Sequence, residues 1–232
     1  VYVRRIKKAY PDYPFVTYVN TSAEVKAESE ICCTSSNAVQ VVEAAAKQAG
    51  VDTVILIPDE YLAKNVAAQT DIRILTWKGA CEVHEQFTPE DIDDLRAAHP
   101  DAIILTHPEC PPEVMAKADY AGSTGAMAAY VKEQSPKTAI LITECSMSDN
   151  VSVENPGVNF VKPCNLCPHM KRITLEGIYD ALRFLRHEVK VDPVTAARAR
   201  ASVQAMLDLP KADKPPHFDT GRDLVDVPYV TV

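Results

Sequence analysis

An internal repeat of about 86 residues limits the fold of this chain more than any other feature. Each copy predicts a strand, a helix, a hydroxyl-rich loop, a second helix and a second strand, over residues 15–59 and again over 102–144. Three pairs of polar residues keep this spacing to within a few residues: Asn20 with His107, Ser35 with Ser123, and Asp59 with Glu144. All α/β units share part of this pattern, but here the hydroxyl loops recur together with the strands. We therefore interpret the pattern as a duplicated structural unit.

Short apolar runs rich in β-branched residues alternate with helical stretches along the chain. Strands are expected at residues 15–19, 53–57, 72–76, 102–106 and 138–143. Helices are expected at residues 23–28, 38–49, 89–98, 112–118, 125–133, 175–189 and 194–209. Most of the strands are followed at once by polar residues, as in buried parallel strands that end at functional loops. The alternation predicts an α/β protein made of repeated three-layer αβα units with short parallel sheets.

Composition excludes several classes of protein. Hydrophobic residues make up 47% of the chain and charged residues 24%, which is ordinary for a globular protein and unlike a disordered or fibrous one. No apolar run reaches the ~18 residues that a membrane-spanning helix needs. The net charge is −8 and no basic block stands out, so neither nucleic acid nor a membrane is expected as a partner.

The seven cysteines raise the question of a metal centre. No apolar signal segment precedes them, so we expect a reducing cytoplasm, where cysteines are more often ligands or buried thiols than disulfides. Cys81 and Cys167 share the repeat spacing, and one further step back falls about five residues before Val1. Three such thiolates around one point suit an iron–sulfur cluster with one open iron. Zinc with a bound water is the competing metal.

The other cysteines give weaker signals. Cys164 and Cys167 form a C-x-x-C pair, which can be a redox pair, half a zinc site or part of a cluster-ligand segment. No second pair lies at a matching spacing, which weakens the zinc interpretation, and Cys164 could also form a disulfide with a neighbour. The remaining cysteines are interpreted as packing or bystander thiols: Cys32, Cys33, Cys110 and Cys145.

The repeat divides the chain into four parts. Residues 1–14 are expected to be a linker from a missing first unit, residues 15–99 one αβα unit, residues 100–173 the next, and residues 174–232 two C-terminal helices with a tail. The tail from Lys211 is expected to be loosely ordered.

Polar residues follow the predicted strands where open α/β sheets bind their ligands. Tyr18 and Asn20 lie at the C-terminal end of one strand, and His107 and Glu109 lie at the end of the corresponding strand of the second copy. His107 and Glu109 could share a proton transfer, although a surface loop with a stray histidine has the same pattern.

The hydroxyl loops, residues 34–37 and Ser123-Thr124, each open a predicted helix. Free helix N–H groups and hydroxyls favour an anion such as a carboxylate or a phosphate. Simple capping of the helix N-terminus explains the same residues equally well.

Several of these segments together resemble the quinolinate synthase (quinolinate synthetase A) family. The resemblance runs over residues 14–181. It rests on these motifs: Tyr18-Val-Asn-Thr-Ser-Ala-Glu-Val-Lys26, Cys33-Thr-Ser-Ser-Asn-Ala38, Trp77-Lys-Gly-Ala-Cys-Glu-Val-His84, His107-Pro-Glu109, Gly122-Ser-Thr124 and Cys167-Pro-His-Met170. They are long, ordered and specific to that family.

The resemblance implies a cytoplasmic transferase that condenses iminoaspartate with dihydroxyacetone phosphate to quinolinate in de novo NAD biosynthesis, with a functional link to L-aspartate oxidase. It implies three units around a pseudo-threefold axis, of which about two are present here, and a [4Fe–4S] cluster held by one cysteine per unit. By position, substrate contacts fall to Tyr18, Asn20, Ser35, His107, Glu109, Ser123 and Thr124, and cluster ligation to Cys81 and Cys167. Tyr18, His107 and Glu109 are the expected catalytic residues, and His84 is a neighbour of the cluster.

The chemistry of the Glu109 carboxyl and the Tyr18 phenol agrees with the catalytic roles that the resemblance implies. If burial raises its pKa, Glu109 can serve as general base or acid for the eliminations, and the Tyr18 phenol can donate to a developing oxyanion. The chain departs from the family in lacking the first unit with its cysteine, so these 232 residues are expected to have little activity. An inactive fragment, a non-catalytic α/β binding module, and a zinc or redox protein using Cys164 and Cys167 stay as alternatives.

Overall fold

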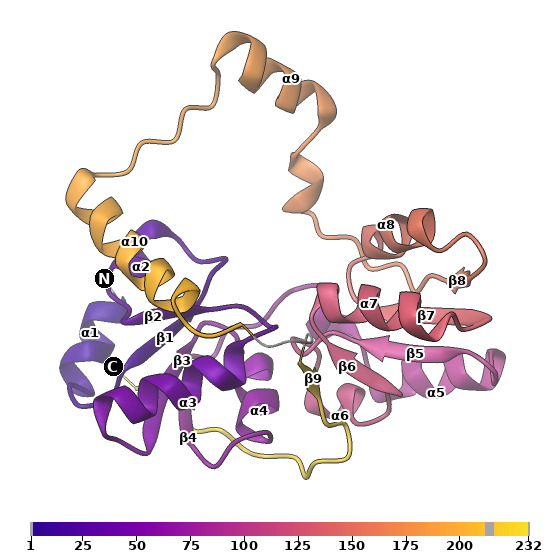
Figure 1. The fold of residues 1–232 in the computed structure, drawn as a ribbon, viewed down its shortest axis with the longest axis horizontal. Coiled ribbons are helices and arrows are strands. Elements are labelled where there is room, and N and C mark those ends of the chain that lie inside the picture. The colour runs from indigo at the N-terminus through magenta and orange to yellow at the C-terminus, as the bar shows by residue number, and fades with distance from the viewer. Residues whose placement is uncertain (1, 212–215, 232) are drawn as a thin grey trace.

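A computed structural model describes residues 2–211 and 216–231 of the chain. It has two mainly parallel sheets, each covered by helices on both faces (Figure 1). The predicted α/β class is therefore confirmed. Within the described ranges, no helix is long and apolar enough to cross a membrane.

The first sheet has four parallel strands in the order β2-β1-β3-β4. The strands are β1 (Phe15–Tyr18), β2 (Ile31–Cys33), β3 (Thr53–Ile57) and β4 (Arg73–Thr76). The helices that connect them are α2 (Ala23–Ala27), α3 (Ala38–Ala49) and α4 (Glu60–Ala67). A further helix, α1 (Tyr2–Ala9), buries Ile6 against the sheet. The sequence analysis predicts a linker over residues 1–14 instead.

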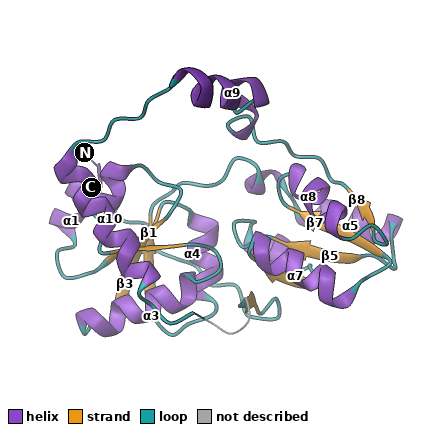
Figure 2. Cartoon of the chain, turned by 45° about the horizontal axis from the view of Figure 1, so that its top comes forward, coloured by secondary structure: helices purple, strands orange, loops and turns teal. Residues whose placement is uncertain are grey.

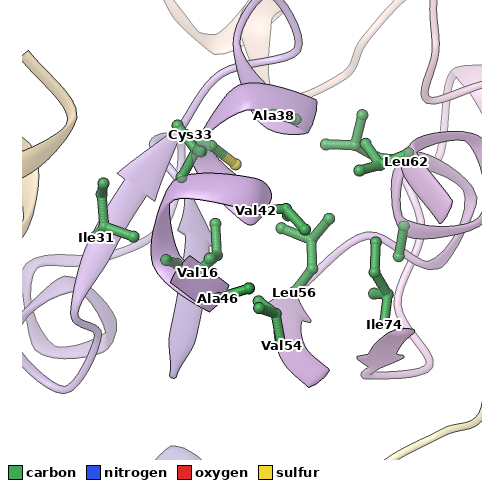
Figure 3. Packing of buried hydrophobic residues seen from close by; sticks show 14 of the residues in the cluster. Val16, Ile31, Cys33, Ala38, Val42, Ala46, Val54, Leu56, Leu62 and Ile74 are labelled. Carbon is green, nitrogen blue, oxygen red and sulfur yellow. The ribbon is translucent and has the colours of Figure 1, made fainter. Parts of the chain in front are cut away.

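Alternation along β3 explains how both faces of this sheet are buried. Val54 and Leu56 pack against α3 and α4 on one face, where Figure 3 shows them beside Val42. Ile55 and Ile57 point to the other face and pack in the cluster that contains Ile6. All five residues of β3 are buried, as is typical of a central parallel strand.

The second sheet repeats this arrangement in the order β8-β7-β5-β6-β9. Its parallel strands are β5 (Ile103–Thr106), β6 (Tyr120–Gly122), β7 (Thr138–Ile142) and β8 (Asn159–Val161), and β9 (His217–Phe218) adds an antiparallel edge. The helices of this unit are α5 (Pro89–Ala98), α6 (Pro112–Met115), α7 (Thr124–Gln134) and α8 (Ser146–Glu154). Read from β6 to β8, the strand order matches that of the first sheet, as the internal repeat predicts.

The C-terminal part crosses back to the first unit. The helix α9 (Leu175–Phe184) stands away from both sheets and buries none of its residues (Figures 1 and 2). It ends at Phe184 because Leu185 adopts a left-handed conformation, so the helix expected up to residue 189 is shorter. The helix α10 (Pro193–Leu207) then packs against α2 and β2.

The described part of the tail is docked, which corrects the expectation of a loose extension. Phe218 in β9 pairs with β6, and Val227 and Val230 are buried. Thr76 donates its N–H to the carbonyl of Pro228 and accepts the N–H of Val230. Apolar side chains spaced along the tail therefore bind it to both units.

Candidate active site

Loops at the carboxyl ends of both sheets enclose one cavity of about 800 Å³. The first unit contributes residues that follow β1, β3 and β4, and the second contributes residues that follow β5, β7 and β8. This is the edge at which parallel α/β sheets bind ligands. The chemically active residues that line it are Tyr18, Asn20, Asp59, Cys81, Glu82, His84, Glu109, Glu144, Cys167 and His169.

The two cysteines of the repeat lie on this same cavity. Cys81 and Cys167 come from different units, are free thiols and are partly exposed. A sulfur of Cys81 also lies with donor atoms of His84 and Glu109 in a group whose atoms are all within 4.8 Å of one another. The site therefore brings together thiol, imidazole and carboxylate groups that bind metals.

Two histidines enclose the Glu109 carboxylate. Its Oε2 lies 3.4 Å from Nδ1 of His84 and 3.2 Å from Nδ1 of His107. The two imidazole rings stack with centroids 4.7 Å apart. Each ring is also held from the opposite unit, since Nε2 of His84 lies 2.9 Å from the Thr143 hydroxyl and Nε2 of His107 lies 3.2 Å from the Ser35 hydroxyl. These contacts hold the two imidazole rings beside the carboxylate.

The electrostatics of Glu109 bear directly on a role in proton transfer. Burial by itself raises the pKa of the Glu109 carboxyl, but the hydrogen bond and charge of His107, followed by His84, outweigh it and hold the pKa below its usual value. The condition named for Glu109, a pKa raised by burial, is therefore not met. Burial first, and then His107, lower the pKa of His84 to about 3, so its imidazole is neutral near pH 7. Glu109 is thus ionised at neutral pH and can accept a proton, but its lowered pKa makes it a weaker base than an ordinary carboxylate.

For Tyr18 and Cys81, burial is the dominant effect on the pKa. Burial, followed by the charge of Glu109, raises the pKa of Tyr18, which therefore stays a phenol that can donate a hydrogen bond. Burial likewise raises the pKa of the Cys81 thiol, while the N–H groups of His84 and Val83 lower it. A thiolate at Cys81 therefore needs a nearby positive charge such as a metal ion.

The two hydroxyl loops line a second cavity of about 720 Å³, which shares Tyr18 with the first. Ser123 caps α7 by accepting the N–H of Ala126, so capping does explain this residue in part. Ser35 caps nothing, because α3 begins after Asn37, and its hydroxyl instead meets His107. Thr124 lines the same cavity. The structure thus places Ser35, Ser123 and Thr124 around one space.

Cys145 and Cys164 form a disulfide, which corrects the interpretation of Cys145 as a bystander. A parallel β-bridge between Glu144 and Asn165 brings the two segments side by side. The disulfide considered for Cys164 is therefore present, with a partner 19 residues away in the chain. Cys164 is therefore not available to pair with Cys167, and the zinc or redox alternative loses one of its two thiols.

Four residues around the site are not among the functional residues that the sequence predicts: Asp59, Asn65, Thr143 and Glu144. Asp59 and Glu144 did carry a signal, because they are equivalent residues of the repeat. Thr143 holds His84, and Asn65 holds the loop around Glu109. Neither carries a motif, since each acts through a contact between the two units.

Asn65 permits a prediction about stability. It is buried on α4 and donates to the carbonyl oxygens of Pro108 at 2.8 Å and of Cys110 at 2.9 Å, on either side of Glu109. Replacing Asn65 by Ala leaves two buried acceptors unpaired, and we expect the free energy of unfolding to fall by about 1–3 kcal/mol. Urea unfolding followed by circular dichroism measures it. The exposed Asn150 on α8 is the control, and Asn150→Ala should stay within about 0.5 kcal/mol of the parent; equal effects of the two changes would contradict the prediction.

Comparison with known proteins identifies the family of the chain. The profile of the family described as "Quinolinate synthetase A protein" matches residues 1–208. The chain is 58% identical over 230 residues to a protein named "Quinolinate synthase" from Caulobacter vibrioides (strain NA1000 / CB15N), which covers 98% of this chain and 63% of that protein. It is 62% identical over 205 residues to "Quinolinate synthase 1" from Mesorhizobium japonicum, covering 88% of this chain and 62% of the relative.

A third relative gives the same result. The protein named "Quinolinate synthase" from Xylella fastidiosa (strain 9a5c) is 58% identical over 205 residues, covering 88% of this chain and 59% of the relative. The chain thus spans about three-fifths of the length of the curated relatives that it matches. The match over most of its residues shows that the chain belongs to the quinolinate synthetase A family.

Proposed function

We propose that this chain forms the larger part of a quinolinate synthase, which condenses iminoaspartate with dihydroxyacetone phosphate in NAD biosynthesis. One observation carries the proposal: two cysteines about 86 residues apart line one cavity together with Glu109 and Tyr18, next to a second cavity lined by hydroxyl loops. Thiols for a cofactor, a proton acceptor and anion-binding hydroxyls are thereby within one connected region.

The donor set fits a [4Fe–4S] cluster. Thiolates are the usual ligands of such clusters, and Cys81 and Cys167 would supply two of them. When bound, the cluster supplies an iron with an open coordination position, which polarises an oxygen of the substrate.

The residues of the chain have distinct tasks in this proposal. Glu109, ionised between the two histidines, accepts a proton during the eliminations, and His107 orients it. The Tyr18 phenol donates to an oxygen that gains negative charge. Asn20 contacts the substrate from the same cavity as the two thiols. Ser35, Ser123 and Thr124 bind its carboxylates or phosphate.

We propose that the third cysteine ligand comes from the part of the whole protein that this chain does not span. The helix α9 supports this view, since Leu175, Leu182 and Leu185 at and just after it are 77–84% exposed. A helix that presents so much apolar surface needs a further protein layer to cover it. A cytoplasmic location and a functional link to L-aspartate oxidase belong to the same proposal.

A zinc protein is the second candidate, because Cys81, His84 and Glu109 lie within 4.8 Å of one another and are typical zinc ligands. Anaerobic reconstitution of the full-length protein with iron and sulfide distinguishes the two. We expect a brown protein that contains iron and sulfide in equal amounts and that makes quinolinate from the two substrates. The 232-residue chain should show little of this activity. A colourless protein with one zinc and no quinolinate formation would favour the zinc site instead.

A further inference from the structure

Asp59 joins the start of a helix to the loop that carries Cys81. It follows β3 and is 5% exposed. Its Oδ1 accepts the N–H of Leu62 at 2.6 Å, which caps α4, and its Oδ2 accepts the N–H of Cys81 at 3.0 Å. One carboxylate thus holds the backbone at the thiol-bearing residue.

Glu144 makes the equivalent connection in the second unit. It follows β7 and is 9% exposed. Its Oε2 accepts the N–H of Ser146 at 2.8 Å, near the start of α8, and its Oε1 accepts the N–H of Cys167 at 3.3 Å. The carboxylate is one methylene longer, yet it contacts the same backbone atom of the corresponding cysteine.

Helix capping does not account for these residues. A single oxygen is enough to cap a helix, as the serine and threonine caps at Ser22, Thr88 and Ser123 of this chain demonstrate. A buried carboxylate costs free energy unless its oxygens are hydrogen-bonded. In both units the second carboxylate oxygen accepts the N–H of the cysteine. Neither cysteine lies in a helix or a strand that would fix its backbone.

We propose that Asp59 and Glu144 are positioning residues for the cluster ligands. Each holds the backbone of the cysteine in its own unit, so that the two thiols are oriented toward the shared cavity before the cluster binds. The identity of the cluster rests on the proposed function, whereas the two hydrogen bonds do not. Groups that orient metal ligands in this way commonly change metal retention when they are replaced.

Hydrogen exchange on the cluster-free, full-length protein tests whether Asp59 and Glu144 hold the backbone of the two cysteines. Asp59→Ser keeps a capping oxygen for α4 and removes the oxygen that reaches Cys81. We expect amide exchange at Cys81 to become about tenfold faster, with exchange at Cys167 unchanged. Glu144→Ala should have the reverse effect. Asp192→Ser is the matched control, because Asp192 caps α10 and its side-chain hydrogen bonds are made with Thr195. Unchanged exchange at Cys81 in Asp59→Ser would overturn the proposal.

Experiments on the reconstituted protein test whether the two positioning residues affect retention of the cluster. Iron loss to a chelator, followed by absorbance and by the electron paramagnetic resonance spectrum, should be about 10- to 100-fold faster in Asp59→Ser and Glu144→Ala than in the parent, with Asp192→Ser unchanged. Asp59→Asn, which keeps one acceptor oxygen, should lie between Asp59→Ser and the parent. Equal retention in all variants would refute the positioning role, whereas a parent that takes up no iron and sulfide would refute the proposed function itself.

Discussion

Replacing Cys81 by Ser in the full-length protein is expected to abolish binding of the cluster and, with it, the formation of quinolinate. Cys81 lies on the cavity that it shares with Cys167, and a serine hydroxyl does not replace a thiolate as a ligand of iron. Iron and sulfide analysis after anaerobic reconstitution measures the loss, which should exceed tenfold. Activity should fall in proportion to the iron content.

Cys33 supplies a matched control for this experiment. It is fully buried in β2 and packs in the core of the first unit, where Figure 3 shows it beside Ala38. Cys33→Ala removes a thiol and lowers stability slightly, yet it should leave the iron content unchanged. Normal iron and sulfide in Cys81→Ser would exclude Cys81 as a ligand. If both variants lose the cluster while staying folded, Cys33 would itself have to be reconsidered as a ligand.

The second large effect is expected from Glu109→Gln. The carboxylate lies 3.2–3.4 Å from two imidazole nitrogens, and its pKa is below the usual value, so it is ionised at neutral pH. Glutamine keeps the size of the side chain but does not accept a proton. We expect kcat to fall by about 10²- to 10⁴-fold, with a much smaller change in KM.

Steady-state kinetics together with iron analysis decide this prediction. Glu113→Gln on α6 is the control, because Glu113 is exposed and lies four residues further along the chain. It should have the activity of the parent. A Glu109→Gln variant that keeps most of its kcat would remove the residue from the proton-transfer role. A loss of kcat that only parallels a loss of iron would assign Glu109 to the cluster site instead.

Local patterns allowed much of the fold to be predicted. The runs at β3 and β7 consist of apolar and β-branched residues, and such runs are buried wherever they occur in a parallel sheet. The elements that were missed have weak local signals. β8 is a three-residue edge strand with half-exposed residues. The helix α4 is an exception, because its capping residue Asp59 is a recognisable helix-start signal.

The sequence by itself determined the α/β class, the repeat and the family motifs, because hydrophobic periodicity and the spacing of residue types can be read along the chain without knowledge of its contacts. Only the tertiary structure decided which side chains of the two units meet. The contacts of His84 with Thr143 and of Ser35 with His107 join residues 59 and 72 positions apart. The direction of the Glu109 pKa follows from such contacts, since it depends on whether burial or two adjacent imidazoles dominate, and no local pattern contains that balance.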